Sequence, residues 1–137
     1  LVMGEYLKKL GVAENEFRID DGSGLSAENA VSPNALVRTL LHNFYSPNRT
    51  VFMETLPVGG MDGTLKNRFS GQLRGRVFAK TGFIANVSSL SGYLKTRNGE
   101  WYAFVILMNG IPDYSNNSIK PLQERIVEAI DDAASMN

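Results

Sequence analysis

Three stretches of the chain repeat apolar residues at intervals of three or four, the spacing of a helix that buries one face. The first stretch covers residues 1–10 and has Gly11 as a C-terminal stop, but no Ser, Thr, Asp or Asn precedes it as a cap. We therefore expect a helix whose earlier turns are missing. Its apolar positions are Leu1, Met3, Tyr6, Leu7 and Leu10.

The second stretch, residues 31–44, has the local signals of a complete helix. Ser32 is a preferred N-cap residue, Pro33 suits the first turn, and Ser46 follows as a stop. His42 falls off the apolar stripe, so a surface histidine is favoured over a catalytic base. The predicted inner face consists of Leu36, Val37, Leu40, Leu41 and Phe44.

The third stretch, residues 116–137, predicts a final helix. It starts with residues that cap helices well, and Pro121 is expected in its first turn, where the missing N–H is tolerated. Its apolar residues fall on one stripe and predict the buried face. That face consists of Ile119, Leu122, Ile126, Val127 and Ile130.

Residues 75–109 change to strand patterning and predict three consecutive antiparallel strands. After the first strand, residues 87–96 alternate apolar and polar positions, and the pair Asn98-Gly99 favours a tight hairpin turn. The next strand, 101–109, is apolar on both faces, which favours a central strand covered by helices on both sides.

The predicted fold class is therefore α+β, with an antiparallel β-sheet flanked by helices and the final helix laid across one face. Residues 45–75 are rich in turn residues and are expected to be mostly loop. The length of 137 residues suits one domain.

Composition excludes several classes of site. The chain has no cysteine and one histidine, so we expect no disulfide, no metal centre and no bound cofactor. The longest apolar run, residues 101–108, is too short to cross a bilayer, so no transmembrane segment is expected. Fourteen cations balance fourteen anions, which disfavours nucleic acid as a partner.

Local charge is less even, because residues 63–99 contain cations and no acidic residue. This segment is either a solvated face of the sheet or a site that attracts a carboxylate or phosphate group. Its cations are Lys66, Arg68, Arg74, Arg76, Lys80, Lys95 and Arg97.

Residues 22–27, GSGLSA, match a dinucleotide-binding turn, but the context is wrong. Pro33 interrupts any helix that would start at these glycines, and no acidic residue lies about twenty positions further on to bind a ribose. We interpret the segment as a tight loop that starts at Asp21-Gly22.

The sequence VFAKTG, residues 77–82, ends an apolar strand with Lys80, Thr81 and Gly82. A Lys and a Gly at a strand end can simply protect a sheet edge from aggregation. The triplet also matches the K-T-G element of serine penicillin-binding proteins and β-lactamases, where it lies beside an acyl-transfer site. The triplet alone does not decide between these interpretations.

Longer matches extend the comparison. Together with VFAKTG, the segments DGSGLS (21–26), LPVGGMDGTLKNRF (56–69) and SSLSGYL (88–94) resemble the D-alanyl-D-alanine carboxypeptidase/endopeptidase family, the low-molecular-mass class C penicillin-binding proteins. The resemblance covers most of residues 18–132. It implies the C-terminal portion of one β-lactamase/transpeptidase-like domain over residues 1–137, in an enzyme that is periplasmic or otherwise exported.

The resemblance also implies roles for four consecutive residues. Lys80 would be catalytic and supply positive charge in the cleft, and Thr81 would donate its hydroxyl to the substrate carboxylate. Gly82 would let the substrate backbone approach the strand edge. The backbone N–H of Phe83 would form half of the oxyanion hole, although many relatives carry a small hydroxyl residue at this position. The expected partners are peptidoglycan stem peptides ending in D-Ala-D-Ala, with β-lactams as inhibitors.

The sequence departs from the family in lacking the nucleophile. No S-x-x-K occurs in the chain, and no S-x-N stands upstream of the loop that begins at Asp21. A formal match, Ser115-Asn116-Asn117, follows the last strand and is interpreted as a turn and helix cap. We therefore expect an inactive C-terminal fragment whose partner is the missing N-terminal part. The alternative is a non-catalytic peptidoglycan-binding or scaffold module with the same fold.

Overall fold

The computed structural model describes residues 2–112 and 116–136 and divides into two compact units. The N-terminal unit comprises Leu1–Arg49 and the C-terminal unit comprises Thr50–Asn137. None of the helices within the described ranges is both long enough and apolar enough to span a membrane.

The N-terminal unit begins with helix α1 (Val2–Lys9), which confirms the first predicted helix. Gly11 ends it with φ +76° and donates its N–H to the Lys8 carbonyl at 2.9 Å. Two short antiparallel strands follow, β1 (Phe17–Arg18) and β2 (Ala30–Val31). The small core of this unit consists of Leu7, Val12 and Ala35, with Tyr6, Leu10, Phe17 and Ile19 packed against it.

Helix α2 (Pro33–Tyr45) confirms the second predicted helix and its cap. The Ser32 hydroxyl accepts the Ala35 N–H at 3.0 Å, which satisfies one of the free donors of the first turn. The predicted inner face is only partly correct, since Leu40 is buried whereas Leu41 is 41% exposed.

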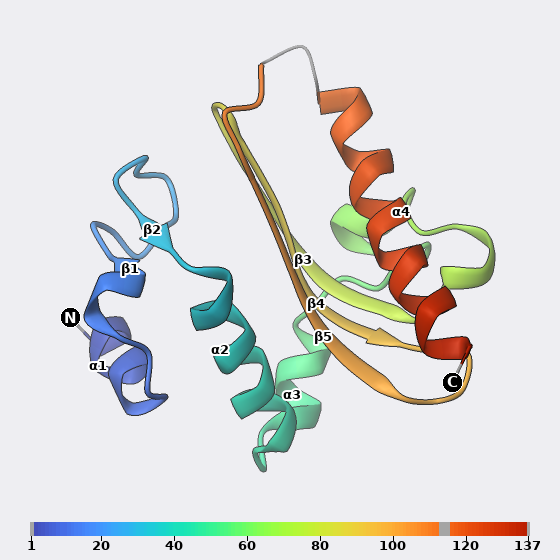
Figure 1. Ribbon diagram of the computed structural model, residues 1–137, viewed down its shortest axis with the longest axis horizontal. Coiled ribbons are helices and arrows are strands. Elements are labelled where there is room, and N and C mark those ends of the chain that lie inside the picture. The colour runs from blue at the N-terminus through green and yellow to red at the C-terminus, as the bar shows by residue number, and fades with distance from the viewer. Residues whose placement is uncertain (1, 113–115, 137) are drawn as a thin grey trace. The chain divides into compact units, whose positions relative to one another are not determined.

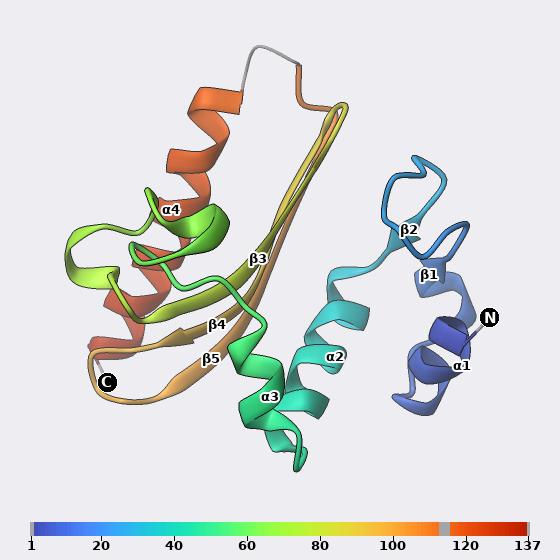
Figure 2. The same ribbon diagram turned by 180° about the vertical axis from the view of Figure 1, so that it is seen from behind.

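The C-terminal unit is built on one antiparallel sheet of three strands, as predicted. The strands β3 (Val77–Ile84), β4 (Val87–Lys95) and β5 (Trp101–Asn109) lie in the order β3-β4-β5. Helix α4 (Asn116–Ser135) runs along one face of the sheet in both ribbon views (Figures 1 and 2). The core between them contains Leu65, Phe69, Leu73, Val77, Ala79, Leu90, Leu94, Phe104, Ile106 and Val127.

The prediction that residues 101–109 form the central strand is wrong, because β4 is central and β5 lies at the edge of the described sheet. Phe104 on β5 is buried in the core, and Val105 on the other face is half-buried. Side-chain polarity reports which faces of a strand are covered. It carries no information on whether a second strand pairs with the backbone, and this is why the pattern misled.

The β4–β5 hairpin is present, but its turn differs from the predicted tight form. The Gly99 N–H donates to the Thr96 carbonyl at 3.0 Å, and Gly99 has φ +85°. Asn98 is absent from the described residues with positive φ, so the pair does not form a type I′ turn, which needs positive φ at both residues. The turn is one residue longer, with glycine at the left-handed position.

The segment predicted to be loop, residues 45–75, contains one more helix, α3 (Arg49–Glu54), and two short 3-10 turns. Phe52 from α3 contacts the Tyr93 ring edge-to-face, with ring centroids 6.3 Å apart. Tyr93 lies on the face of β4 opposite to α4. A six-residue helix gives too short a periodic signal to be recognised among turn residues.

The buried face of α4 also differs from the prediction. Val127 is buried as expected, but Leu122 is 38% exposed, whereas Gln123 and Asp131 are only 1% and 2% exposed. Pro121 lies inside the helix rather than in its first turn. Helix α4 begins at Asn116, and the turn expected at Ser115 concerns a residue outside the described ranges.

Asp131 is buried because two arginines from the basic segment neutralise it. The Arg76 guanidinium donates two hydrogen bonds to its carboxylate, at 2.9 and 2.8 Å, and the Arg97 N–H donates a third at 3.0 Å. The hydrogen bonds from Arg76, followed by that from the Arg97 backbone, hold the pKa of Asp131 below its usual value. This cluster fixes the start of β3 to the end of α4.

We predict that Asp131→Asn lowers the free energy of unfolding by about 3 kcal/mol at pH 7, because it removes the charge partner of the Arg76 guanidinium, whose side chain is only 19% exposed. The folded-state pKa of Asp131 is lowered, so its stabilisation is complete above the unfolded-state pKa of about 3.9 and is lost as the pH falls through the folded value. The difference in unfolding free energy between the unmodified protein and Asp131→Asn should therefore become smaller in acid.

Urea denaturation at several pH values measures this difference. Asp132→Asn is the matched control, because Asp132 is adjacent, bonds Arg97 and has a side chain that is 62% exposed. It should change the stability by less than about 1 kcal/mol. An equal loss in the two variants would contradict the role given to Asp131.

Candidate active site

One edge of β3 is free of a pairing strand over its second half, within the described residues. At its start, the Ala79 N–H donates to the Pro57 carbonyl at 3.0 Å, and the Gly59 N–H donates to the Val77 carbonyl at 2.8 Å. These bonds show that the backbone N–H and C=O groups of Val77 and Ala79 point away from β4. The direction of these groups alternates from one residue of a strand to the next. The backbone groups of Thr81 and Phe83 therefore point to the same outer edge.

The side chains of the four predicted site residues lie on two faces of β3. Ala79 is packed in the core under α4, so Thr81 and Phe83 share the α4 face by alternation. Lys80 and Gly82 lie on the opposite face. Lys80 is exposed, and its Nζ donates to the Thr81 carbonyl oxygen at 2.7 Å, at the outer edge.

Thr81 has a second threonine as its neighbour, which sequence reasoning did not single out. The Oγ1 atoms of Thr81 and Thr64 are 3.0 Å apart. Thr64 belongs to the segment 56–69 that carried the family resemblance. The Asp62 carboxylate accepts the Val58 N–H at 2.7 Å and closes the loop before it. Thr64 could have been proposed from its motif, but only the fold brings it to Thr81.

A cavity of about 200 Å³ lies on the α4 side of the strand end. Two cationic residues line it, Arg68 from the loop after Thr64 and Lys120 from α4. Among the described residues that line it, none is acidic. The remaining lining residues are Thr64, Thr81, Ser88, Ser89, Gly82 and Phe83.

Arg68 is nearly buried, with 7% of its surface exposed, and is held by α4. Its Nε donates to the Glu124 carboxylate at 2.9 Å, and its Nη2 donates to Gln123 Oε1 at 3.0 Å and to the Lys120 carbonyl at 3.1 Å. Gln123 in turn donates its amide to Ser88 Oγ at 3.2 Å. The wall of the cavity is therefore a fixed polar network.

The loop 21–26 lies in the N-terminal unit and is a tight turn, as predicted. The Asp21 carboxylate accepts hydrogen bonds from the Ser23 hydroxyl and the Asn29 amide, both at 2.6 Å, and from the Gly24 and Ser26 N–H groups. These contacts, with Ser23 first and Asn29 second, lower the pKa of Asp21 to about 2. The Asp21 carboxylate therefore holds the loop in its folded form.

Comparison with solved structures identifies the fold. A representative of class A beta-lactamase from Bacteroides cellulosilyticus has a TM-score of 0.57 and 21% identity, with 94% of this chain and 53% of that chain covered. Penicillin binding protein 4 (dacB) from Haemophilus influenzae, solved in complex with a beta-lactam, has a TM-score of 0.72 and 35% identity, covering 80% of this chain and 26% of that chain. The fold is β-lactamase/transpeptidase-like, as predicted.

Sequence comparison gives the family. The model of the D-Ala-D-Ala carboxypeptidase 3 (S13) family matches residues 1–132, and the chain belongs to this family of penicillin-binding carboxypeptidases. The D-alanyl-D-alanine carboxypeptidase DacB of Haemophilus influenzae is 34% identical over 128 residues, which cover 91% of this chain and 26% of that protein. The family resemblance expected from the sequence is confirmed. The chain spans about a quarter of the length of this relative.

The structure shows a second reason why position 82 is a glycine, apart from substrate approach. A Cβ at this position would lie 2.4 Å from Ser89 Oγ on β4, closer than real contacts allow. We predict that Gly82→Ala lowers the free energy of unfolding by about 0.5 to 1.5 kcal/mol, because the half-buried Ser89 hydroxyl must rotate away to make room. The double variant Gly82→Ala/Ser89→Ala removes the hydroxyl and should recover most of the loss, as measured by denaturant unfolding.

Ser89→Ala alone is the control and should change stability by less than about 0.5 kcal/mol. If the double variant is as unstable as Gly82→Ala, contact with Ser89 is not the structural reason for the glycine.

Proposed function

We propose that this chain is the C-terminal part of a serine-type D-Ala-D-Ala carboxypeptidase/endopeptidase that cleaves peptidoglycan peptides through an acyl-enzyme. The proposal rests most on the free edge of β3, where Lys80, Thr81 and the Phe83 N–H meet, in a chain of this family. The nucleophilic serine belongs to the part of the longer protein outside residues 1–137. The chain alone is then inactive.

Each group at the edge has a role in acyl transfer. When the serine oxygen attacks the carbonyl carbon, negative charge develops on the carbonyl oxygen, and a fixed N–H donor stabilises it. The Phe83 N–H supplies one such donor, because it belongs to a strand whose other edge is paired with β4. Lys80 supplies positive charge that favours removal of the serine proton.

Substrate binding follows from the same edge. An extended peptide can add to a free strand edge through its main chain, with the Thr81 carbonyl and the Phe83 N–H as its partners. The Thr81 hydroxyl donates to the carboxylate of the residue after the scissile bond. The amine of that residue leaves with a proton, and water then hydrolyses the ester of the acyl-enzyme. β-Lactams present a similar carbonyl and carboxylate, and we propose them as inhibitors and the exported cell envelope as the location.

The longer protein that carries this sequence should be acylated by a labelled penicillin and should release D-Ala from a pentapeptide. Lys80→Ala should slow acylation by about a hundredfold or more, because it removes charge beside the nucleophile. Thr81→Val should slow it by roughly 10- to 100-fold, through loss of one hydrogen bond to a charged group. Acylation assays stopped at fixed times measure the acylation rates of the longer protein and of these two variants.

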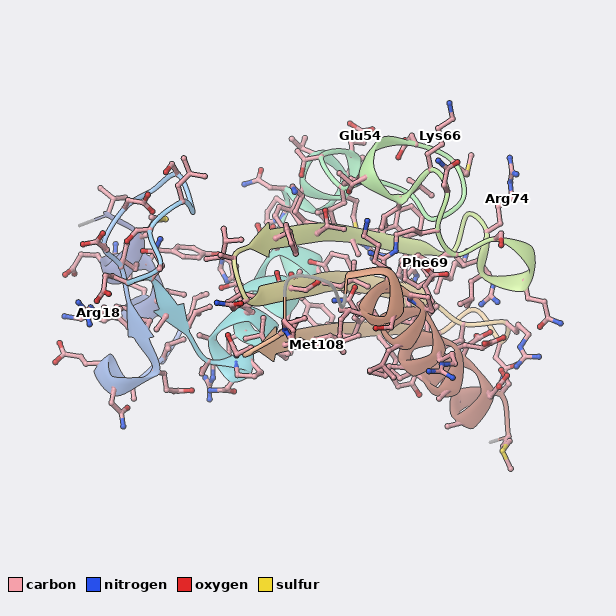
Figure 3. All side chains as sticks on the ribbon, turned by 90° about the horizontal axis from the view of Figure 1, so that it is seen from above. Arg18, Glu54, Lys66, Phe69, Arg74 and Met108 are labelled. Carbon is pink, nitrogen blue, oxygen red and sulfur yellow. The ribbon has the colours of Figure 1, made fainter. Side chains whose placement is uncertain are left out.

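Lys66→Ala is the matched control, because Lys66 is also an exposed lysine of the basic segment but extends away from the sheet (Figure 3). It should react at the parent's rate. A folded Lys80→Ala protein that also reacts at the parent's rate would reduce the triplet to protection of a sheet edge. Absence of acylation in the longer protein itself would favour a non-catalytic peptidoglycan-binding module.

A further inference from the structure

The cationic groups near Thr81 lie on opposite faces of β3. Lys80 projects from the face away from α4, and its Nζ bonds the Thr81 carbonyl at the outer edge. The Thr81 hydroxyl is on the α4 face and lines the cavity that contains Arg68 and Lys120. A carboxylate that contacts the Thr81 hydroxyl therefore has two cations on its own side of the strand, and Lys80 is not one of them.

Arg68 has donors to spare in this cavity. A guanidinium carries five N–H donors, and the described contacts of Arg68 use only Nε and Nη2. Its Nη1 has no partner among the described residues, although the side chain is only 8% exposed. A buried donor without a partner costs free energy, so the position favours an acceptor that enters from the cavity.

The charges of the cavity favour an anion. Glu124 pairs with Arg68 and balances one positive charge, but Glu124 is not a lining residue. Lys120 lines the cavity without an ion pair among the described residues. The Thr81 and Thr64 hydroxyls are 3.0 Å apart, and because one O–H is used between them, the pair offers one further O–H donor at the strand. The lining thus combines net positive charge with a hydroxyl donor, which is the chemistry that binds a carboxylate.

We propose that this cavity is the subsite for the carboxylate of the leaving residue, and that Lys120 and Arg68, not Lys80, determine the preference for a free carboxylate. The inference rests on the proposed function and deepens it. Lys120 acts as a specificity residue from α4, and Arg68 provides the fixed donor behind it. Lys80 is then left to assist proton transfer, so its loss affects charged and neutral substrates alike.

The test compares a peptide ending in D-Ala-D-Ala with the same peptide as its C-terminal amide, which lacks the charge. In the longer protein, kcat/KM is measured for both. Lys120→Gln should lower the value for the free acid by roughly 2- to 5-fold, the upper range for one exposed charge interaction, and leave the amide unchanged. Lys80→Ala should lower both values by the same factor.

Two more variants sharpen the test. Lys66→Gln makes the same charge change outside the cavity and should leave the acid-to-amide ratio at the parent's value. Arg68→Lys keeps the charge but loses the planar donors, and in the folded protein it should also reduce the ratio. Because Arg68 is buried, the thermal melting of the Arg68→Lys protein is measured first, to show that it folds. The Lys120→Gln result decides the matter if Arg68→Lys does not fold.

The outcomes separate the two proposals. If the parent is not acylated by penicillin, the proposed function fails. If the parent is active and Lys120→Gln lowers acid and amide equally, or changes neither, the subsite assignment is wrong. It is also wrong if Lys80→Ala abolishes the preference for the free acid, because Lys80 would then hold the carboxylate.

Discussion

The pairing of β3 with β4 determines where every group of the candidate site points. Its register places Gly92 opposite Ala79, and a Cβ at Gly92 would lie 2.0 Å from the Phe78 carbonyl oxygen. The two strands can therefore keep this register only with glycine there. A shift of one residue would move Thr81 to the face of Lys80 and turn the Phe83 N–H from the free edge toward β4.

The basic segment 63–99 is balanced by acids that lie far away in the sequence. Three of its arginines, Arg68, Arg76 and Arg97, form ion pairs with acidic residues of α4. These pairs connect the middle and the C-terminal end of the helix to the loop at Arg68 and to the turns before β3 and after β4. They leave the lysines of the segment for other roles. The alternatives considered for this segment, a solvated face or an anion site, omitted this structural use of its charge.

Much of the fold could be predicted from local patterns, because helix spacing, the Ser32 cap and strand alternation are short-range signals. The order of the strands could not, since the polarity of β5 does not report its backbone partner. Buried polar residues were missed for a related reason. Gln123 and Asp131 are tolerated inside only because Arg68 and Arg76 reach them from distant segments. The four site residues on β3 came from a motif, whereas Thr64, Arg68 and Lys120 required the folded chain.

The central claim is that the free edge of β3 forms one wall of an acyl-transfer site. A crystal structure of the longer protein after reaction with penicillin tests it most directly. The account predicts the acyl carbonyl oxygen within about 2.7 to 3.1 Å of the Phe83 nitrogen, with the penicillin carboxylate at the Thr81 hydroxyl on the α4 side. An adduct whose carbonyl oxygen points away from β3, or whose carboxylate lies on Lys80 alone, would contradict it.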